Sequence, residues 1–479
     1  MPVLYDTSVD IPSFAGLNQS GDGYNMSLRY AREMENVLVT GGVFQQMREG
    51  VPLAQTLPSP IETLCVLNRR YYAGEGEKDI LAAVAGGALY TKTMDGSDEW
   101  QLRYDGFVNN DFDYVTYEVN PEGSTAPVDV LLLSNADDGM FCLYGNDLHV
   151  EAVVTPYKFG VLARFNERIW GAGIPDMPDS LVYSAPYDPF DWEQNSEIPE
   201  DGAGEIMQPS WDGDSFVSLK QSGSYLLCFK KNGVWRIYGT NPGEFVIRQL
   251  YGGGTVAENT VVPYSGYVLM LGWGGLMRYD GNQVSPFQQD VVRNIFQKQM
   301  NWEKVNLCKA AMRGRVYCLA LPLGETNYCN AVLEYDTHEG TFALRKEIYV
   351  GSFASNDNRV FYTSNYTPGQ VFEMDDSKGK PLFVHWVGAW QDLGIKSSVK
   401  STFTVYFLAE AETSFEMYLG LRTEKKLKKK FITVKPNHKT MRVHMNVQGR
   451  FFRLEIGSTT AVPFRIDGGI KIDMELDPD

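Results

Sequence analysis

Short apolar runs separated by polar or glycine-containing turns dominate the middle of the chain. In seven places one such run is followed, across a turn, by a second run that commonly ends in an aromatic residue. Runs of this length are typical of strands buried on both faces, and two such strands joined by a turn form a hairpin. The first runs are 69–72, 130–133, 168–170, 225–229, 267–271, 315–319 and 359–362, and the second are 88–90, 140–144, 181–183, 234–238, 276–279, 332–335 and 371–373.

The hairpins recur at a regular spacing. One apolar residue from each second run serves as an anchor: Leu89, Phe141, Val182, Trp235, Met277, Leu333 and Phe372. The gaps between successive anchors are 52, 41, 53, 42, 56 and 39 residues, with a mean of about 47, and a period of roughly 40 to 50 residues is typical of propeller blades. A ring of blades covers their faces and leaves few exposed edges. The sequence therefore predicts an all-β fold with a β-propeller of six to seven blades over residues 61–385.

The flanking segments have other patterns. Residues 1–60 are polar, glycine-containing and irregular, which predicts an N-terminal arm that runs over the surface and supplies a closing strand; a short helix is expected at 26–34. The best helix candidate inside the propeller is 290–302, where apolar residues fall near helical spacing. Residues 386–479 are predicted to form a small C-terminal β-sandwich. Its longer alternating strands are expected at 401–408, 413–421, 430–435, 441–447, 451–456 and 470–476.

Composition and charge limit the classes of partner. The chain has 479 residues, 43% of them hydrophobic, and a net charge of -17, which excludes a wholly disordered chain. The acidic balance argues against a general nucleic-acid coat, because non-specific DNA binding depends on Lys and Arg that neutralise phosphates. The longest nearly apolar run, 267–277, is too short to cross a bilayer, and residues 1–10 lack the pattern of a cleaved signal. We therefore expect no membrane segment.

One segment has the opposite charge. Residues 391–450 contain twelve Lys and Arg against five Asp and Glu, a balance of +7, which leaves -24 for the rest of the chain. The candidate contact residues are Arg422, Lys425, Lys426, Lys428, Lys429 and Lys430. They are compatible with a solvated hairpin edge that lysines protect from aggregation. They are also compatible with an electrostatic contact to DNA or to the acidic surface of a neighbouring subunit. No aromatic residue separates the lysines, which argues against stacking on single-stranded bases.

The residues that usually carry catalysis or bind metals are sparse. Six cysteines form no CxxC pair and have apolar neighbours, which predicts buried thiols in strands and synthesis in a reducing compartment. Only five histidines occur, without an HExxH or His-x-His motif, and neither GxSxG nor GxxxxGK[ST] is present. We therefore expect no catalytic residues, no metal and no cofactor.

Two other functions are compatible with a propeller. A glycosidase needs two carboxylates that face each other across a sugar, and Asp188 with Asp191, or Asp111 with Asp113, could supply them, although Asp-Pro is also ordinary turn chemistry. A propeller that binds a surface glycan, as an adhesin does, needs aromatic platforms. Its candidates are Trp170, Trp192 and Trp273, for which packing between blades is the other interpretation.

Several stretches, taken in order along the chain, resemble one family. They are 11–18; 31–36 with the glycine-containing strand that follows; 181–186 leading through Asp188 and Asp191 to Trp192; 226–229 with 234–239; 267–272 with Gly275, 279–281 and 284–285; and 449–454. Over most of residues 10–375 the chain is similar to the phage propeller proteins called packaged-DNA stabilisation proteins, the tail nozzle proteins of short-tailed phages. Each stretch is strand and turn chemistry, and their order is what carries the resemblance.

The resemblance implies a virion structural protein at the head-to-tail connector or tail nozzle, made in the host cytoplasm. Such proteins form homo-oligomers, usually hexameric rings, beneath the portal and adaptor. They extend the channel for double-stranded DNA, help to retain the packaged DNA, and let it pass during ejection. The family offers no catalytic motif to transfer to this chain. An acidic channel wall would suit this role, because it repels DNA and lets it slide.

Overall fold

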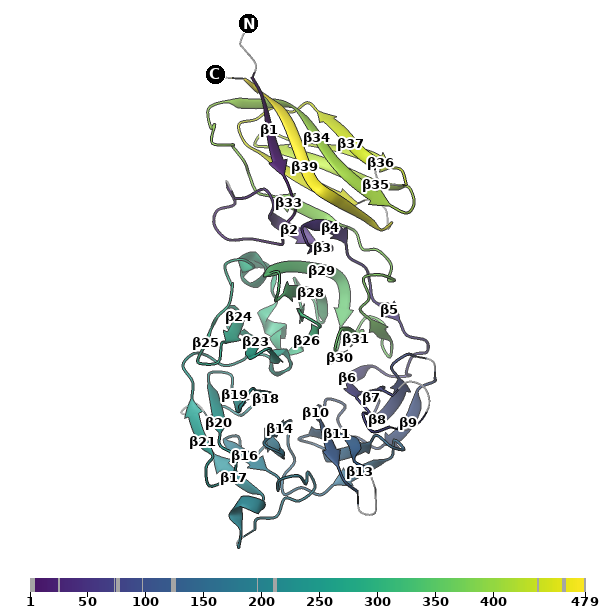
Figure 1. Cartoon of the computed structure of the whole chain (residues 1–479), viewed down its shortest axis with the longest axis vertical. Helices are drawn as coiled ribbons and strands as arrows, with labels where there is room; N and C mark the ends of the chain where they lie inside the picture. Colours follow the sequence, from purple (N-terminus) through teal and green to yellow (C-terminus); the bar gives the residue numbers. More distant parts are fainter. Residues whose placement is uncertain are drawn as a thin grey trace.

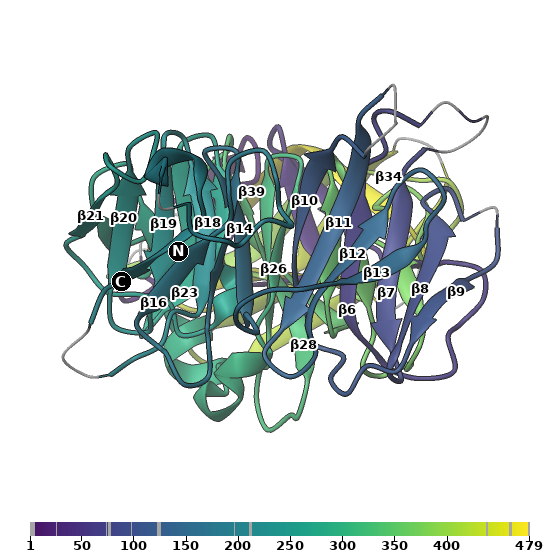
Figure 2. The same cartoon turned by 90° about the horizontal axis from the view of Figure 1, so that it is seen from below.

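A computed structural model describes residues 5–24, 26–72, 74, 78–96, 98–121, 126–195, 197–209, 213–436, 439–458 and 462–477. It shows an elongated, almost entirely β-structured molecule in two parts (Figure 1). A ring of small sheets occupies one end of the long axis, and two larger sheets packed face to face occupy the other. Seen from below, the strands of the ring stand side by side and their connecting loops gather at its two ends (Figure 2).

The ring is a seven-bladed β-propeller, in which each blade is a four-stranded antiparallel sheet of described residues. Blade 1 is β6 (Ile61–Leu67), β7 (Ile80–Ala85), β8 (Ala88–Thr93) and β9 (Gln101–Asp105); blade 2 is β10 (Asp113–Val119), β11 (Val128–Asn135), β12 (Gly139–Tyr144) and β13 (Val150–Val153); blade 3 is β14 (Val161–Phe165), β15 (Arg168–Ala172), β16 (Ser180–Tyr183) and β17 (Gly204–Met207). Blade 4 is β18 (Ser218–Ser222), β19 (Tyr225–Phe229), β20 (Val234–Tyr238) and β21 (Val246–Gln249); blade 5 is β22 (Val262–Tyr264), β23 (Tyr267–Gly272), β24 (Gly275–Tyr279) and β25 (Val284–Pro286); blade 6 is β26 (Ala310–Arg313), β27 (Val316–Leu321), β28 (Cys329–Asp336) and β29 (Thr341–Val350). Blade 7 is β30 (Phe353–Asn356), β31 (Arg359–Thr363), β32 (Val371–Glu373) and β5 (Val51–Pro52).

The predicted hairpins are the second and third strands of the blades. Their pairing confirms the pattern, as in Val130 opposite Tyr144 and Leu226 opposite Ile237. Both faces of these middle strands are covered, and every residue of β11 and β15 is buried. The first run was misplaced, because the strand is β7 and residues 69–72 lie in the loop before it. There the Arg69 guanidinium lies 3.8 Å from the centre of the Tyr72 ring, so Tyr72 makes a cation–π contact within the loop.

The innermost strands close the ring. Each of β6, β10, β14, β18, β22, β26 and β30 contacts the next, and β30 returns to β6. The last blade receives its outer strand from the N-terminal segment: β5 pairs with β32, so that Val51 lies opposite Glu373. The Gly50 amide donates to the Tyr362 hydroxyl at 3.2 Å, and the Leu53 amide donates to the Val371 carbonyl at 2.8 Å. The N-terminal segment therefore does supply a closing strand, as its composition suggested.

The second part is a β-sandwich built from both ends of the chain. One sheet contains β3 (Val37–Thr40), β4 (Val43–Gln46), β39 (Phe464–Asp477), β34 (Val399–Ala411) and β37 (Lys439–Met445), with β1 (Tyr5–Ile11) also paired to β39. The other contains β2 (Ala31–Glu35), β33 (His385–Gly388), β38 (Phe452–Ser458), β35 (Phe415–Thr423) and β36 (Leu427–Val434). The expected sandwich of residues 386–479 thus gains four N-terminal strands that the prediction assigned to a surface arm.

Helical structure is limited to short pieces among the described residues: η1 (Pro199–Asp201), η2 (Glu258–Thr260), the π-helix η3 (Ile295–Gln299) and η4 (Trp302–Leu307). The helix expected at 290–302 is reduced to η3 and the start of η4. The helix expected at 26–34 is wrong, because strand β2 occupies its second half. Met34 lies opposite the buried Trp386 of β33, so pairing within the sheet overrides the local preference.

The two parts share one continuous core. Buried side chains of blades 5 and 6 and of both sandwich sheets form a single hydrophobic cluster. The outer strand of blade 6, β29, is covered by the N-terminal segment: the Leu17 amide donates to the Phe342 carbonyl and the Asn36 amide to the Leu344 carbonyl, each at 2.8 Å. Gly16 is required at this crossing, since a Cβ there would lie 2.7 Å from the Phe342 carbonyl oxygen. The edge of blade 6 is thereby hidden by the sandwich.

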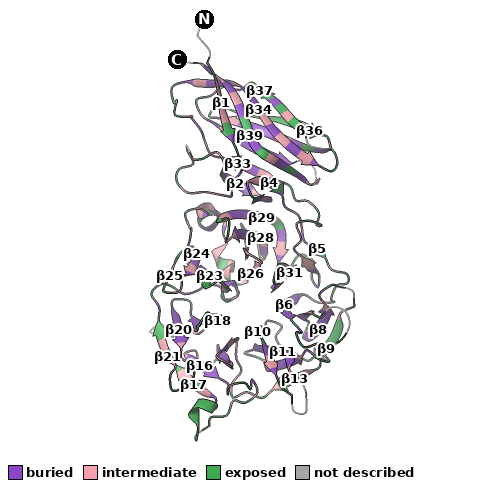
Figure 3. Ribbon diagram, in the orientation of Figure 1, coloured by how far each residue is buried: buried purple, intermediate pink, exposed green. Residues whose placement is uncertain are grey.

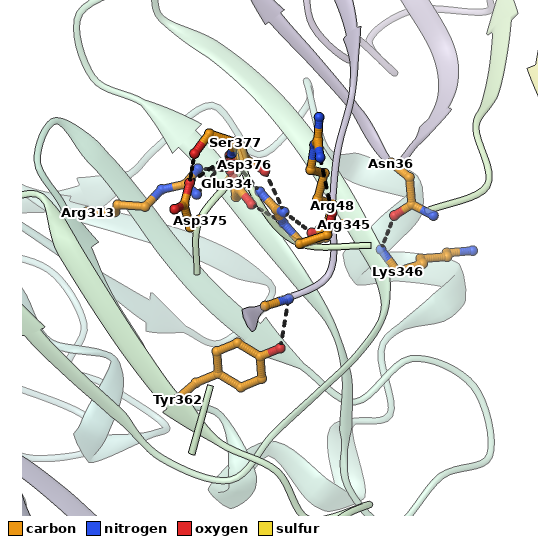
Figure 4. Close-up of polar contacts among 12 residues, drawn as sticks. Asn36, Arg48, Arg313, Glu334, Arg345, Lys346, Tyr362, Asp375, Asp376 and Ser377 are labelled. Carbon is orange, nitrogen blue, oxygen red and sulfur yellow. Dashed lines mark hydrogen bonds and ion pairs between the residues drawn. The ribbon is translucent and has the colours of Figure 1, made fainter. Parts of the chain in front are cut away.

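A buried network of ion pairs stabilises the same junction between the propeller and the sandwich (Figure 4). Arg345, whose side chain is 1% exposed, contacts Glu334 at 2.7 Å and Asp376 at 2.8 Å. Arg313 contacts the other oxygens of the same two carboxylates, at 2.8 and 2.9 Å. Arg345 also donates to the carbonyl of Arg48, just before the closing strand. The network therefore joins blade 6 to the two chain segments that connect the propeller with the sandwich.

Candidate functional site

The basic residues predicted from the sequence lie on one hairpin of the sandwich. Arg422 is near the end of β35, Lys425 and Lys426 are in the turn, and Lys428, Lys429 and Lys430 are on β36. Strand β36 is the last strand of its sheet, paired only with β35, so its outer side has no neighbouring strand among the described residues. It lies on the sandwich, the part of the molecule away from the propeller (Figure 1).

The structure divides these lysines between the two faces of the hairpin. Lys428 and Lys430 reach across to the other sheet, where their ammonium groups donate to the carbonyls of Asn446 and His444, each at 3.3 Å. These two lysines therefore protect a strand edge, since inward-pointing charges discourage pairing with another chain. Lys429 lies on the opposite face, with its Nζ 4.1 Å from the centre of the Tyr418 ring.

Arg422 is 40% exposed, but its charge is paired with a carboxylate. Its Nε donates to Glu455 Oε1 at 2.8 Å, and the Glu455 side chain is almost completely buried. Arg453 approaches the same carboxylate oxygen at 3.6 Å. Arg422 therefore neutralises an internal carboxylate, which leaves the lysines that follow it as the candidate contact residues.

A second polar site lies at the centre of the propeller. A cavity of about 250 Å³ opens where the innermost strands begin, and two of the predicted carboxylates, Asp111 and Asp113, line it. Lys309 Nζ is 3.7 Å from Asp111 Oδ1, and Asp113 Oδ2 accepts a hydrogen bond from the Leu162 amide at 2.8 Å. Asp113 thus fixes the neighbouring blade, which is a structural task.

Glu258, which the sequence did not single out, borders the same end of the ring. It lines a small adjoining cavity together with Asp111 and Asp113. Its carboxyl remains in contact with solvent but is crowded by protein, and this desolvation raises its pKa. Lys309 acts against that rise, while Asp111 and Asp113 add to it. No group of three or more His, Cys, Asp or Glu among the described residues is arranged to hold a metal ion.

The other two candidate carboxylates form turns. Asp188 accepts a hydrogen bond from the Phe190 amide and Asp191 from the Glu193 amide, each at 2.9 Å. Contacts of this kind, from an Asp side chain to the amide two residues later, are ordinary turn chemistry. Both residues lie in the loop after β16 and do not line the central cavity. The structure therefore places Asp111 and Asp113 on one cavity, whereas Asp188 and Asp191 lie in a turn-forming loop elsewhere.

The three tryptophans proposed as glycan platforms have different environments. Trp170 is 0% exposed and donates from Nε1 to the Phe165 carbonyl. Trp192 packs on Phe159 with ring centres 5.0 Å apart. Only Trp273 is open, being 64% exposed at the turn between β23 and β24, with its ring centre 6.2 Å from that of Trp302. Trp170 and Trp192 therefore have packing roles, and Trp273 is the one exposed ring among the three candidate glycan platforms.

All six cysteines are buried and free. Five of them lie in strands of the blades, and Cys308 directly follows η4. Burial raises the pKa of the Cys318 thiol to about 12 and that of Cys65 further still. Thiols held in the protonated form are poor nucleophiles. Among the described residues, no helix is long and apolar enough to span a membrane.

One charged surface was missed in the sequence. The segment 184–207, here called the acidic lobe, contains the loop after β16, η1 and β17, and has no Lys or Arg. Its carboxylates, all exposed, are Asp188, Asp191, Glu193, Glu197, Glu200, Asp201 and Glu205. The lobe forms the lower tip of the molecule in Figure 1 and is largely exposed in Figure 3. A count of charge in shorter windows would have found it.

Comparisons with known proteins add little to the description of the fold. No family model matches the chain, and no curated protein matches it significantly. Among solved structures, the Pan2 WD40 domain of Neurospora crassa matches with a TM-score of 0.41 and 10% identity, over 70% of this chain and 97% of that one. BBS1N, in its complex with ARL6DN, matches with a TM-score of 0.40 and 11% identity, over 69% of this chain and 99% of that one. The assignment as a propeller therefore rests on the sheets themselves.

Proposed function

We propose that this chain is a structural protein of a phage virion, a tail nozzle or packaged-DNA stabilisation protein that forms a ring around the DNA channel. The proposal includes a homo-oligomer, with a hexameric ring as the expected form, that contacts the portal, adaptor and other tail proteins. Double-stranded DNA passes through it without sequence-specific contacts. The role is mechanical, so neither an enzymatic activity nor a cofactor is part of the proposal.

The observation that carries the proposal is the ordered set of sequence stretches, placed on the fold. Residues 226–229 and 234–239 are the middle hairpin of blade 4, and 267–272 with 279–281 form that of blade 5. Residues 11–18 and 449–454 lie in the sandwich and at its junction with blade 6. The resemblance therefore extends over both parts of the molecule, in the order in which the chain builds them.

The DNA path in this proposal lies between copies of the chain. The central cavity of one propeller holds about 250 Å³ and is lined by charged side chains such as Lys220 and Lys309. A sphere of that volume is only about 8 Å across, whereas the major groove of B-DNA alone is about 12 Å wide, so a duplex cannot pass through a single propeller. A ring of several copies is needed, and the propellers then form part of its wall.

The charge of the chain suits such a wall. Residues outside 391–450 carry a balance of -24, and a wall of that sign attracts few phosphates and allows DNA to slide. The basic hairpin of the sandwich is then expected away from the lumen. A lumen lined by that hairpin, with the acidic surface turned outward, would contradict the sliding wall.

Electron microscopy of the purified protein and of the virion tests the proposal. We expect a ring with a central hole wide enough for duplex DNA, at the neck or tail of the particle. Antibodies or a fused tag on the chain should label the same position. A monomer that is absent from purified particles would contradict the proposal.

A further inference from the structure

Strand β36, which has no outer neighbour among the described strands, carries an exposed aromatic residue. Phe431 is 65% exposed, and its ring centre is 6.2 Å from that of Tyr418, on the face that also carries Lys429. Lys425 and Lys426 are exposed in the adjoining turn. An exposed aromatic residue surrounded by charges is typical of a protein contact, whereas a strand edge that is only protected needs no exposed ring.

The one carboxylate of the turn, Glu424, accepts hydrogen bonds from the backbone amides of Arg450 and Phe451, and the lysines outnumber it. Within the described part of the chain, no carboxylate lies within ion-pairing distance of Lys425, Lys426 or Lys429. Lys428 and Lys430 are occupied by carbonyls of the opposite sheet. The outward lysines and Phe431, here called the basic edge, are therefore available to an acidic partner.

The acidic lobe has the complementary properties. Seven exposed carboxylates lie between Asp188 and Glu205 without one intervening Lys or Arg. Large apolar side chains are exposed among them: Tyr187 at 75%, Ile198 at 50% and Met207 at 61%. Each surface thus combines an apolar centre with charges of one sign, and the signs are opposite.

The two surfaces cannot meet within one molecule. The basic edge lies on β36 and the turn before it in the sandwich, and the acidic lobe, which includes β17, lies at the far end of the propeller (Figure 1). We propose that the basic edge of one copy docks on the acidic lobe of the next copy. The contact joins two different surfaces, so it is heterologous and propagates from copy to copy until a ring closes or a filament forms. It deepens the proposed function, on whose ring its biological meaning rests.

A pair of charge-reversed variants tests the proposal. The edge variant carries Lys425→Glu, Lys426→Glu and Lys429→Glu, and the lobe variant carries Glu193→Lys, Glu197→Lys and Glu200→Lys. In either variant alone, the edge and the lobe carry charges of the same sign and repel each other. We therefore expect its self-association, measured by analytical ultracentrifugation, to weaken by about tenfold or more. In the equimolar mixture the two reversed surfaces meet each other with opposite charges, and the two unchanged surfaces do the same. Association in the mixture should therefore return to the wild-type level.

The controls separate charge from folding. A variant with Lys158→Glu, Lys231→Glu and Lys298→Glu changes the net charge as much as the edge variant does, at exposed positions on the propeller, and should associate like wild type. Thermal unfolding checks that every variant is folded. The wild-type protein gives a test without substitutions: its association should weaken as NaCl rises from about 0.05 to about 0.5 M. Salt-independent association, or failure of the mixture to recover, would overturn the proposal.

The remaining outcomes are also decisive. Unchanged association of the edge variant, together with lost binding to a duplex DNA fragment in a gel shift, would assign the basic edge to DNA. Unchanged association and unchanged DNA binding would leave it as a solvated edge. Rings that form in the particle from the edge variant would overturn this contact while leaving the proposed function standing. Wild-type protein that stays monomeric at every salt concentration would overturn it as well.

Discussion

Asp376 shows how a single residue holds two parts of the molecule together. It follows the last blade and accepts from both Arg345 and Arg313, which belong to the neighbouring blade. Burial opposes its charged form, but the two guanidinium groups outweigh burial and hold the pKa of Asp376 well below its usual range. The carboxylate is therefore ionised in the folded protein at any ordinary pH.

Substitution Asp376→Asn should be strongly destabilising, because it leaves Arg345 buried with one carboxylate fewer. We expect a loss of about 3 to 5 kcal/mol in the free energy of unfolding at neutral pH. Since the folded pKa lies below the unfolded value of about 3.9, the stabilisation is complete above that value and is lost progressively as the pH falls from there through the folded pKa. Denaturant unfolding of both proteins at several pH values should thus show a difference that shrinks below about pH 4.

The control is Glu339→Gln, which removes a surface carboxylate 3.7 Å from Arg315. Surface ion pairs contribute little, so its effect should stay below about 1 kcal/mol. An equal effect of the two substitutions would contradict the special role of the buried network.

At the scale of elements, the loop between β31 and β32 binds the N-terminal segment through hydrogen bonds. The Leu57 amide donates to the Gly369 carbonyl at 2.9 Å, and the Gln370 side chain donates to the Leu53 carbonyl at 2.7 Å. These contacts continue the pairing of β5 with β32. The closing strand has only two residues, so its loop contacts contribute much of the closure.

Substitution Gly369→Ala should weaken ring closure. The φ of Gly369 is +77°, and a Cβ there would lie 2.0 Å from the Leu57 carbonyl oxygen. Gly324→Ala is a matched control, because Gly324 has a φ of +75° and a Cβ there would meet no atom within 4 Å. The control should cost about 1 kcal/mol from backbone strain alone. Gly369→Ala should cost clearly more in thermal unfolding, and equal losses would show that the contact is unimportant.

At the scale of the whole molecule, the sandwich depends on both ends of the chain. Strands β1 and β4 pair with β39, and β2 pairs with β33. Phe14 of the N-terminal segment packs against Trp386, with ring centres 5.8 Å apart. Residues 385–477 alone would therefore expose much of the surface that these strands cover.

A chain that begins at residue 48 keeps the closing strand but loses β1 to β4. We expect its sandwich to unfold, so that limited proteolysis cleaves within 385–477 while the propeller resists. A chain that begins at residue 12 loses only β1 and should be more resistant. A proteolytic pattern unchanged from wild type in the shorter chain would contradict this dependence.

The blade hairpins were predictable because their information is local: two apolar runs and the turn between them. Pairings between distant segments left no such signal. Met34 was expected in a helix, although its position opposite Trp386 decides its strand conformation. The basic hairpin was visible as a run of charge, but the sequence could not show that Lys428 and Lys430 point to the opposite sheet, or that Arg422 is bound to Glu455. Those facts depend on the register of the strands.

The pairing of β1 with β39 also sets a time scale for synthesis. Ile11 lies opposite Ile470, so the first strand must wait for about 460 further residues. At about 5 to 20 residues per second, the ribosome needs roughly 20 to 90 s to supply its partner. During this interval one sheet of the sandwich lacks the strand to which β1, β4 and β34 all pair. A translation product that ends before β39 therefore cannot complete the sandwich, and folding itself separates complete chains from truncated ones.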